Sequence, residues 1–210
     1  MSEASASGGR RRGRPAKLSR QSILAAALAL VDREGAQALT MRRLGAELGV
    51  EAMSVYRHVA DRAELLDGLA DLLATEIEPH RGEVEWPDAL RTFAGELRAV
   101  ARRHPDAFAL VGTRVLATRF VLRPVEEVLA SLRSGGFTPA RAIFAYRLVA
   151  SYVRGYALAE VGGGFAIEVS PQTPLPAVRA LSRRLASEPT ERSFRDGIEA
   201  IIVGLRAQGD

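Results

Sequence analysis

The amphipathic pattern of the chain begins after residue 18. From Ser19 to Gly35 apolar residues fall three and four positions apart, with a capping hydroxyl at the start and a glycine at the end. This spacing predicts one helix whose buried face carries Ile23, Leu24, Ala27, Leu28, Leu30 and Val31.

Two shorter helices are expected next. Thr40 is placed to cap a helix that Gly49 ends, and a third helix is expected over about Ala52 to Val59. Two short helices joined by a tight glycine-containing turn are typical of a helix-turn-helix, whose second helix reads DNA. Asp61 then caps a fourth, leucine-rich helix that reaches about Ile77 and can join this head to the rest of the chain.

The remainder keeps helical periodicity between breaks rich in Gly and Pro. Helices are expected at about 87–103, 105–111, 119–134, 139–160, 174–187 and 189–206. Only the stretch from Phe165 to Val169 alternates with a period of two residues. The predicted fold class is all-α, with a three-helix DNA-binding head at 18–66 and a larger helical domain at 67–210.

Composition narrows the class of protein. Of the 210 residues 47% are hydrophobic, enough for a real core, and the absence of cysteine leaves no disulfide or thiolate metal site. No apolar run is long enough to span a bilayer, and the N-terminus lacks the apolar stretch of a secretory signal. The expected location is therefore the cytoplasm, without membrane contact.

The positive charge is concentrated at the N-terminus. The net charge is +4, yet residues 1–20 hold six Arg and Lys residues against one acidic residue, so the rest is nearly neutral. Residues 1–17 are expected to form a disordered basic arm. Arg12 and Arg14, on either side of a glycine, have the composition of an arm that enters an A·T-rich minor groove. A leader that only aids solubility is the alternative.

A run of residues in the head matches a known pattern in order and spacing. These are Ile23, Ala26, Ala27, Leu30, Gly35, Leu39, Thr40, Arg42, Leu44, Ala46, Leu48, Gly49, Val50, Val55, Tyr56, His58, Leu65 and Leu66. With them the chain resembles the tetracycline-repressor (TetR) family, and a fainter resemblance to the tetracycline-repressor branch continues through Trp86 and Gly112-Thr113-Arg114. It implies a homodimer joined by the last two long helices of each subunit, and a ligand-binding and dimerisation domain at 67–210.

The resemblance also implies which residues touch DNA. By the resemblance, Ala52, Met53, Arg57 and His58 make base and backbone contacts. Tyr56 contacts a phosphate, and Thr40, Arg42 and Arg62 hold the DNA backbone. Residue type alone adds Ser54 to the projecting face of the reading helix and places Val55 and Val59 on its buried face.

Several of these residues have a plainer interpretation. Met53 lacks a hydrogen-bond donor, so it could read thymine methyl groups or only fill space. Arg57 could contact guanine or grip phosphate, and His58 could be a packing residue. Arg42 and Arg43 are adjacent and cannot both face DNA, so one of them is expected to be a surface charge.

Apolar and aromatic residues of the C-terminal domain are candidates for a cavity wall. The predicted ligand-binding residues are Phe93, Leu97, Leu110, Leu116, Phe120, Phe144, Arg147, Tyr152 and Tyr156. Each could equally be ordinary core. Where tetracycline-responsive relatives place a metal-binding His and neighbouring Asn and Phe, this chain has Leu110-Val111, Phe93 and Leu97. The resemblance therefore implies an apolar or aromatic effector that needs no metal or other cofactor.

Other function classes find less support in the sequence. The three histidines are not at metal-ligand spacing, and Gly162 to Gly164 lacks the Lys and Ser or Thr of a phosphate loop, so no enzyme is predicted. The predicted function is a small-molecule-responsive repressor that leaves a palindromic operator when ligand binds. The alternatives are a sequence-independent architectural DNA-binding protein and a helical ligand-binding dimer with a vestigial head.

Overall fold

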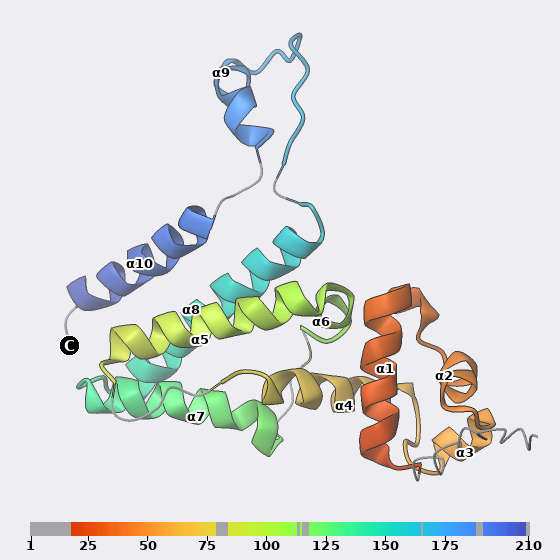
Figure 1. Cartoon of the computed structure of the whole chain (residues 1–210). Coiled ribbons are helices and arrows are strands. Elements are labelled where there is room, and N and C mark those ends of the chain that lie inside the picture. The colour runs from red at the N-terminus through yellow and green to blue at the C-terminus, as the bar shows by residue number, and fades with distance from the viewer. Residues whose placement is uncertain are drawn as a thin grey trace, which may run out of the picture.

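The computed structural model of the chain is built of helices (Figure 1). It describes residues 18–78, 84–112, 114, 118–164, 166–187 and 191–208, and these ranges contain no strand. The prediction of an all-α fold is confirmed. The predicted arm with Arg12 and Arg14 and the predicted ligand residue Leu116 lie outside the described residues.

The helices follow one another with short connections, apart from the excursion that carries α9. They are α1 (Arg20–Glu34), the 3₁₀ turn η1 (Ala36–Ala38), α2 (Met41–Leu48), α3 (Ala52–Tyr56), α4 (Arg62–Thr75), α5 (Trp86–Arg103), α6 (Pro105–Val111), α7 (Arg119–Ser134), α8 (Pro139–Val161), α9 (Pro176–Leu185) and α10 (Glu191–Ala207). Within the described ranges, no helix is both long enough and apolar enough to pass through a lipid bilayer.

Side-chain caps fix where the helices of the head begin. Ser19, Thr40 and Asp61 each accept a hydrogen bond from the backbone N–H three residues later, at 3.1, 3.1 and 2.8 Å. Each bond satisfies a backbone donor that the first helical turn leaves without a partner. The three predicted caps are confirmed.

Three segments differ from the sequence-based expectation. α3 ends at Tyr56 because the chain then turns to return Val59 to the core, where it is 1% exposed. α9 begins at Pro176, since proline suits the first helical position and holds the residue before it in extended backbone. The described part of 165–169 forms no strand, and the Ile167 N–H donates to the end of α9 instead.

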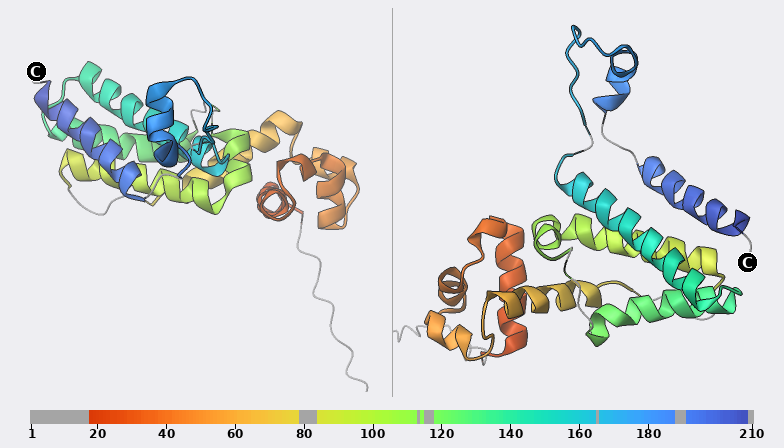
Figure 2. Two further views of the ribbon diagram at one scale, coloured as in Figure 1. Left: turned by 90° about the horizontal axis from the view of Figure 1, so that it is seen from above. Right: turned by 180° about the vertical axis from the view of Figure 1, so that it is seen from behind.

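Two hydrophobic clusters organise the molecule. The first joins α1, α2, α3 and α4 to α6 and the end of α5, and the second joins α5, α7, α8 and α10. Leu65 and Leu69 place α4 in the first cluster, and Ile77 beyond its end packs against both. α4 therefore runs from the head into the body, whereas α9 buries no residue and stands apart from the body (Figures 1 and 2).

Candidate DNA interface and ligand pocket

The helix α3 has one buried face and one exposed face. Val55 is fully buried and Val59 is 1% exposed, and both belong to the core of the head. On the other face Met53 and Tyr56 are 67% and 42% exposed. Ala52 and Ser54 are partly exposed. An exposed methionine and tyrosine on a helix anchored by two valines suit a surface that meets a partner.

The residues that flank α3 extend this surface. Thr40, Arg57, His58 and Arg62 are all exposed. In the part of the chain that the structure describes, the side chains of Arg57, His58 and Arg62 make no hydrogen bond or ion pair, and the His58 ring is not part of the core. Thr40 accepts the capping bond on its hydroxyl oxygen, which leaves the hydroxyl hydrogen to donate.

Two glycines set the turn between α2 and α3. A β-carbon at Gly45 would lie 2.9 Å from the carbonyl oxygen of Val50 and 3.2 Å from the backbone nitrogen of Ala52. Gly49 ends α2 with φ 67°, in the left-handed region that glycine adopts without steric cost. The first glycine lets the two helices approach, and the second reverses the chain.

The adjacent residues Arg42 and Arg43 have different surroundings. Arg43 donates to Glu34 from Nε at 3.1 Å and to Glu47 from Nη1 at 3.0 Å, and Arg33 also bonds to Glu47 at 2.9 Å. Hydrogen bonds from Arg43 and then Arg33 lower the pKa of Glu34. Arg42 is exposed and, among the described residues, has no ion pair. Arg43 is therefore the surface charge of the pair, which leaves Arg42 available for phosphate.

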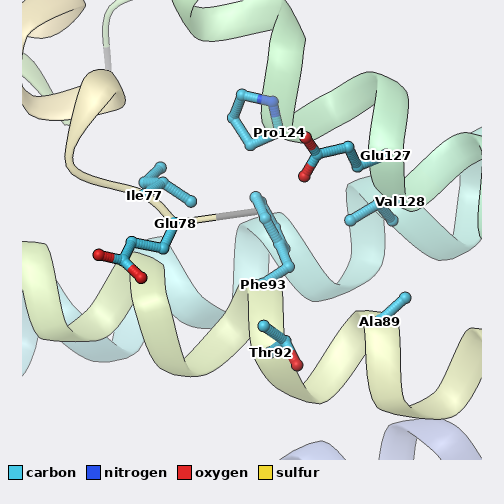
Figure 3. A pocket seen from close by; sticks show the side chains of 8 residues that line it. All are labelled: Ile77, Glu78, Ala89, Thr92, Phe93, Pro124, Glu127 and Val128. Carbon is cyan, nitrogen blue, oxygen red and sulfur yellow. The ribbon is translucent and has the colours of Figure 1, made fainter. Parts of the chain in front are cut away.

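A pocket of about 560 Å³, open to solvent, lies between α4, α5, α6, α7 and α8. A narrower pocket of about 210 Å³ shares three lining residues with it, Ile77, Phe93 and Pro124. Figure 3 shows the narrower one, with the Phe93 ring standing between Ile77 and the α7 side chains. The walls are mostly apolar, as small-molecule sites usually are.

Of the predicted ligand-binding residues that the structure describes, Phe93 lines these pockets. Leu97 is buried in the core of the body and Leu110 packs against the first cluster. The rings of Tyr152 and Tyr156 lie 5.8 and 5.1 Å from the Phe194 ring, which places them between α8 and α10. In this single chain they fill the core rather than the pocket wall.

Three predicted ligand residues lie on the surface of the body instead. Phe120 is 38% exposed beneath the Arg119 guanidinium, which is 4.7 Å from its ring centre. Phe144 is 49% exposed and Arg147 is exposed, both on α8. They line neither pocket, so their contact with ligand stays a prediction.

Other lining residues were not predicted from the sequence. Tyr146 and Arg154 of α8 line the larger pocket, as does Val111. The α8 pair is eight residues apart, with Ala150 midway, a spacing that keeps residues on one side of a helix. That stripe was the available signal. Within the described ranges, no three His, Asp or Glu side chains gather as metal ligands would.

An ion cluster around the buried Arg98 ties α5 to α8 and α10. Arg98, whose side chain is 5% exposed, donates to Glu160 from Nε at 2.8 Å and to Glu191 from Nη1 at 2.7 Å. Its guanidinium also lies 4.4 Å from the Phe194 ring centre. The hydrogen bonds from Arg98 lower the pKa of Glu160. Arg98 and Glu160 therefore hold helices together rather than facing the pocket.

His104 joins the head to the body at the corner between α5 and α6. Its Nδ1 lies 2.7 Å from the Asp32 carboxylate of α1, and its Nε2 lies 3.1 Å from the Glu76 carboxylate at the end of α4. Arg103 also pairs with Glu76. This joint contacts α1 and the end of α4, so a shift of either helix changes the contacts of His104.

A helix-turn-helix head with an exposed second helix, joined by α4 to an all-helical body with an apolar pocket, defines a DNA-binding regulator with a ligand site. The family described as "Bacterial regulatory proteins, tetR family" matches residues 23–69, and "Tetracyclin repressor-like, C-terminal domain" matches residues 78–208. The chain belongs to the TetR family of bacterial regulatory proteins.

Curated relatives agree with this assignment. A transcriptional regulator of Saccharopolyspora erythraea is 38% identical over 144 residues, 68% of this chain and 61% of that protein. A repressor of Streptomyces coeruleorubidus is 34% identical over 152 residues, 71% of this chain and 56% of that protein. The chain thus spans about three fifths of the length of these two relatives. The class D tetracycline repressor of Escherichia coli is 30% identical over 92% of this chain and 91% of its own length.

Solved structures share the fold. The Streptomyces coelicolor TetR family protein ActR in complex with (S)-DNPA has a TM-score of 0.77 and 31% identity, covering 93% of this chain and 100% of that one. ActR in complex with actinorhodin has a TM-score of 0.78 and 30% identity over the same shares.

Proposed function

We propose that the protein is a homodimeric transcriptional repressor that releases its operator when a small molecule fills the pocket between α4 and α8. The observation that carries this proposal is the position of α4. Leu65 and Leu69 fix its first half in the core of the head, while Ala70, Ala74 and Ile77 line the pocket. A ligand that displaces the pocket side of α4 therefore moves the head with it.

The exposed face of α3 is the DNA-reading surface of this proposal. Arg57 is the residue best suited to specify sequence, because a guanidinium can donate two hydrogen bonds to guanine. Tyr56, Thr40, Arg42 and Arg62 surround it and grip phosphates, which position the head without reading sequence. A dimer would hold two α3 helices about one DNA turn apart, roughly 34 to 36 Å, and so would read a palindrome in the cytoplasm.

The dimer is supported by apolar side chains that one chain leaves exposed. Ile143 and Phe144 of α8 are 42% and 49% exposed, Leu148 is 37% exposed, and Val203 of α10 is 61% exposed. Exposed apolar residues on two long helices suit a face that a second subunit covers. A symmetric pairing of this face in two copies would place one head at each end of the dimer.

Regulation follows from linkage between the two sites. A ligand that weakens operator binding must itself bind less tightly to the DNA-bound protein. Structures of ActR hold small molecules, and the pocket supports the same kind of response in this chain. The proposal contains no catalytic step, since the family is one of regulators.

The test is selection of binding sites from a random duplex pool by the purified protein, with the Arg57→Ala variant beside it. We expect enrichment of a two-fold symmetric site by the wild type and a relaxed or lost site for the variant. Equal binding to all duplexes would instead support an architectural DNA-binding protein. Binding to none would leave a ligand-binding dimer with a vestigial head.

A further inference from the structure

The polar groups of the larger pocket carry charge of one sign. Among its described lining residues are two guanidinium groups, Arg114 and Arg154, and the phenol of Tyr146, but no carboxylate. The other lining side chains are apolar. A partly buried site with fixed positive charge and low-dielectric walls favours an anionic occupant.

The two arginines are not equivalent. Arg114 donates from Nε to the Asp67 carboxylate of α4 at 2.6 Å, so its charge is already balanced within the chain. Arg154 lies partly buried on α8 and, among the residues that the structure describes, its guanidinium has no ion pair or hydrogen bond. A guanidinium has five N–H donors, and leaving them without acceptors in a partly desolvated place costs free energy. An acceptor on a bound ligand would recover that cost.

The space beside Arg154 suits a flat aromatic body. Phe93, Phe108 and Tyr146 line the pocket from three different helices, and the ring centres of Phe93 and Tyr146 are 5.9 Å apart. Aromatic walls pack well against an aromatic ligand. The pocket thus combines aromatic walls with one unbalanced cation.

The adjoining narrower pocket has the opposite sign. Among the described residues its charged lining groups are Glu78 and Glu127, without a cation, and it shares Phe93 and Ile77 with the larger one. In Figure 3 the Glu127 carboxylate points toward Pro124 and toward the middle of the labelled lining residues, whereas the Glu78 carboxylate points away from Phe93. A ligand that extends into the narrower pocket would place a neutral hydrogen-bond donor such as a hydroxyl near these carboxylates, and not its anionic group.

We infer that the effector is an aromatic acid whose carboxylate pairs with Arg154 while its rings lie against Phe93, Phe108 and Tyr146. This inference rests on the proposed function and names the chemical class of ligand for its pocket. Arg154 is then the residue that selects acids over their neutral analogues. A bidentate pair between guanidinium and carboxylate would strengthen binding of the acid and fix the orientation of its carboxylate.

The probes that test it are anthracene-2-carboxylate and anthracene-2-carboxamide, which have the same shape and differ in charge. Binding of each to the full-length protein is measured by fluorescence titration at constant ionic strength. We expect the carboxylate to bind the wild type at least about tenfold more tightly than the amide, because hydrogen bonds between charged groups are the strong ones.

Three variants locate the effect. Arg154→Gln should abolish the preference for the acid and leave the affinity for the amide nearly unchanged. Arg183→Gln changes the same residue type on α9, where the arginine is exposed and does not line the pocket, and it should keep the preference. Val121→Phe fills part of the pocket without changing a charge, and it should weaken both probes alike.

Equal binding of the two probes, binding of neither, or a preference that survives Arg154→Gln would overturn the inference. Operator release is measured separately with a labelled duplex. A wild type that prefers the acid through Arg154 but keeps its operator would uphold the inference and contradict the proposed ligand response.

Discussion

Two neighbouring arginines at the start of α2 show that the partners of a side chain decide whether it is available to bind DNA. Arg43 is held by Glu34 and Glu47, whereas Arg42 has no partner among the described residues. We predict that Arg42→Ala weakens binding to every duplex and reduces the slope of log affinity against log salt by about 1, since each phosphate contact releases a counterion. Fluorescence anisotropy at several salt concentrations measures both quantities.

Arg43→Ala is the matched control for that experiment. It removes the same charge from the next residue, but from a side chain that turns toward α1. Its salt slope should equal that of the wild type. If the two variants lose the same slope, Arg43 reaches DNA as well and the assignment of the pair is wrong.

The two glycines of the turn allow a stability test. At Gly49 the space is open and only the positive φ opposes a side chain, so Gly49→Ala should cost about 1 kcal/mol. At Gly45 a β-carbon would meet the Val50 carbonyl oxygen at 2.9 Å, so Gly45→Ala should cost about 2 to 3 kcal/mol and displace α3.

Urea unfolding measures the two costs, and operator affinity measures the displacement. Gly49→Ala should bind operator like the wild type, whereas Gly45→Ala should bind it weakly even where it is folded. Equal operator binding by both variants would show that the approach of α2 to α3 does not position the reading helix.

At the scale of elements, the contact of α5 with α8 and α10 depends on a charge. Hydrogen bonds from Arg98 hold the pKa of Glu160 below its usual value of about 4.5. A carboxylate with a depressed folded-state pKa stabilises the fold fully above its unfolded-state pKa, and this stabilisation is lost as the pH falls through the folded-state value. The free energy of unfolding should therefore fall as the solution is acidified below about pH 4.5.

We predict that Glu160→Gln lowers the free energy of unfolding by about 2 kcal/mol at neutral pH and flattens this acid-induced loss, because the charged hydrogen bonds from Arg98 are weakened. Glu126 lies exposed on α7 with no partner among the described residues, so Glu126→Gln serves as the control. Urea unfolding from pH 3 to 7 gives the comparison. A variant as acid-sensitive as the wild type would contradict the role of Glu160.

Elements were easier to predict from the sequence than the pocket. Thr40 and Asp61 cap helices through bonds to residues three positions away, so a local pattern contains the information. The pocket wall instead brings together Ile77, Pro124 and Arg154 from distant parts of the chain. The aromatic side chains that face the pocket are decided by how far the packed helices are shifted along one another. Tyr152, for example, donates to the Phe194 carbonyl at 3.2 Å and so turns away from the pocket toward α10.

At the scale of the whole molecule, the apolar face of α8 and α10 predicts the assembly. Leu148→Glu together with Val203→Glu places charge in that face and should give a monomer that keeps its helical content apart from α9 and binds operator more weakly. Light scattering and circular dichroism measure these properties. Leu122→Glu on α7, where the leucine is 46% exposed, is the control and should remain a dimer. A dimeric double variant would place the interface elsewhere.

The position of the head relative to the body also depends on contacts of His104. Two carboxylates, Asp32 and Glu76, lie within hydrogen-bond distance of the two imidazole nitrogens of His104. His104→Gln keeps two hydrogen-bonding atoms without an imidazole, so it tests the joint through operator affinity with and without ligand.

We expect the folding of α9 to depend on the second subunit of the proposed dimer. A ten-residue helix is too short to persist in water without tertiary contacts, and α9 buries none of its residues against its own chain. Leu175 and Leu181 are 56% and 53% exposed. The helicity of this segment should therefore rise and fall with protein concentration, so that dilution alone would melt it and open it to proteases while the rest of the fold stays intact.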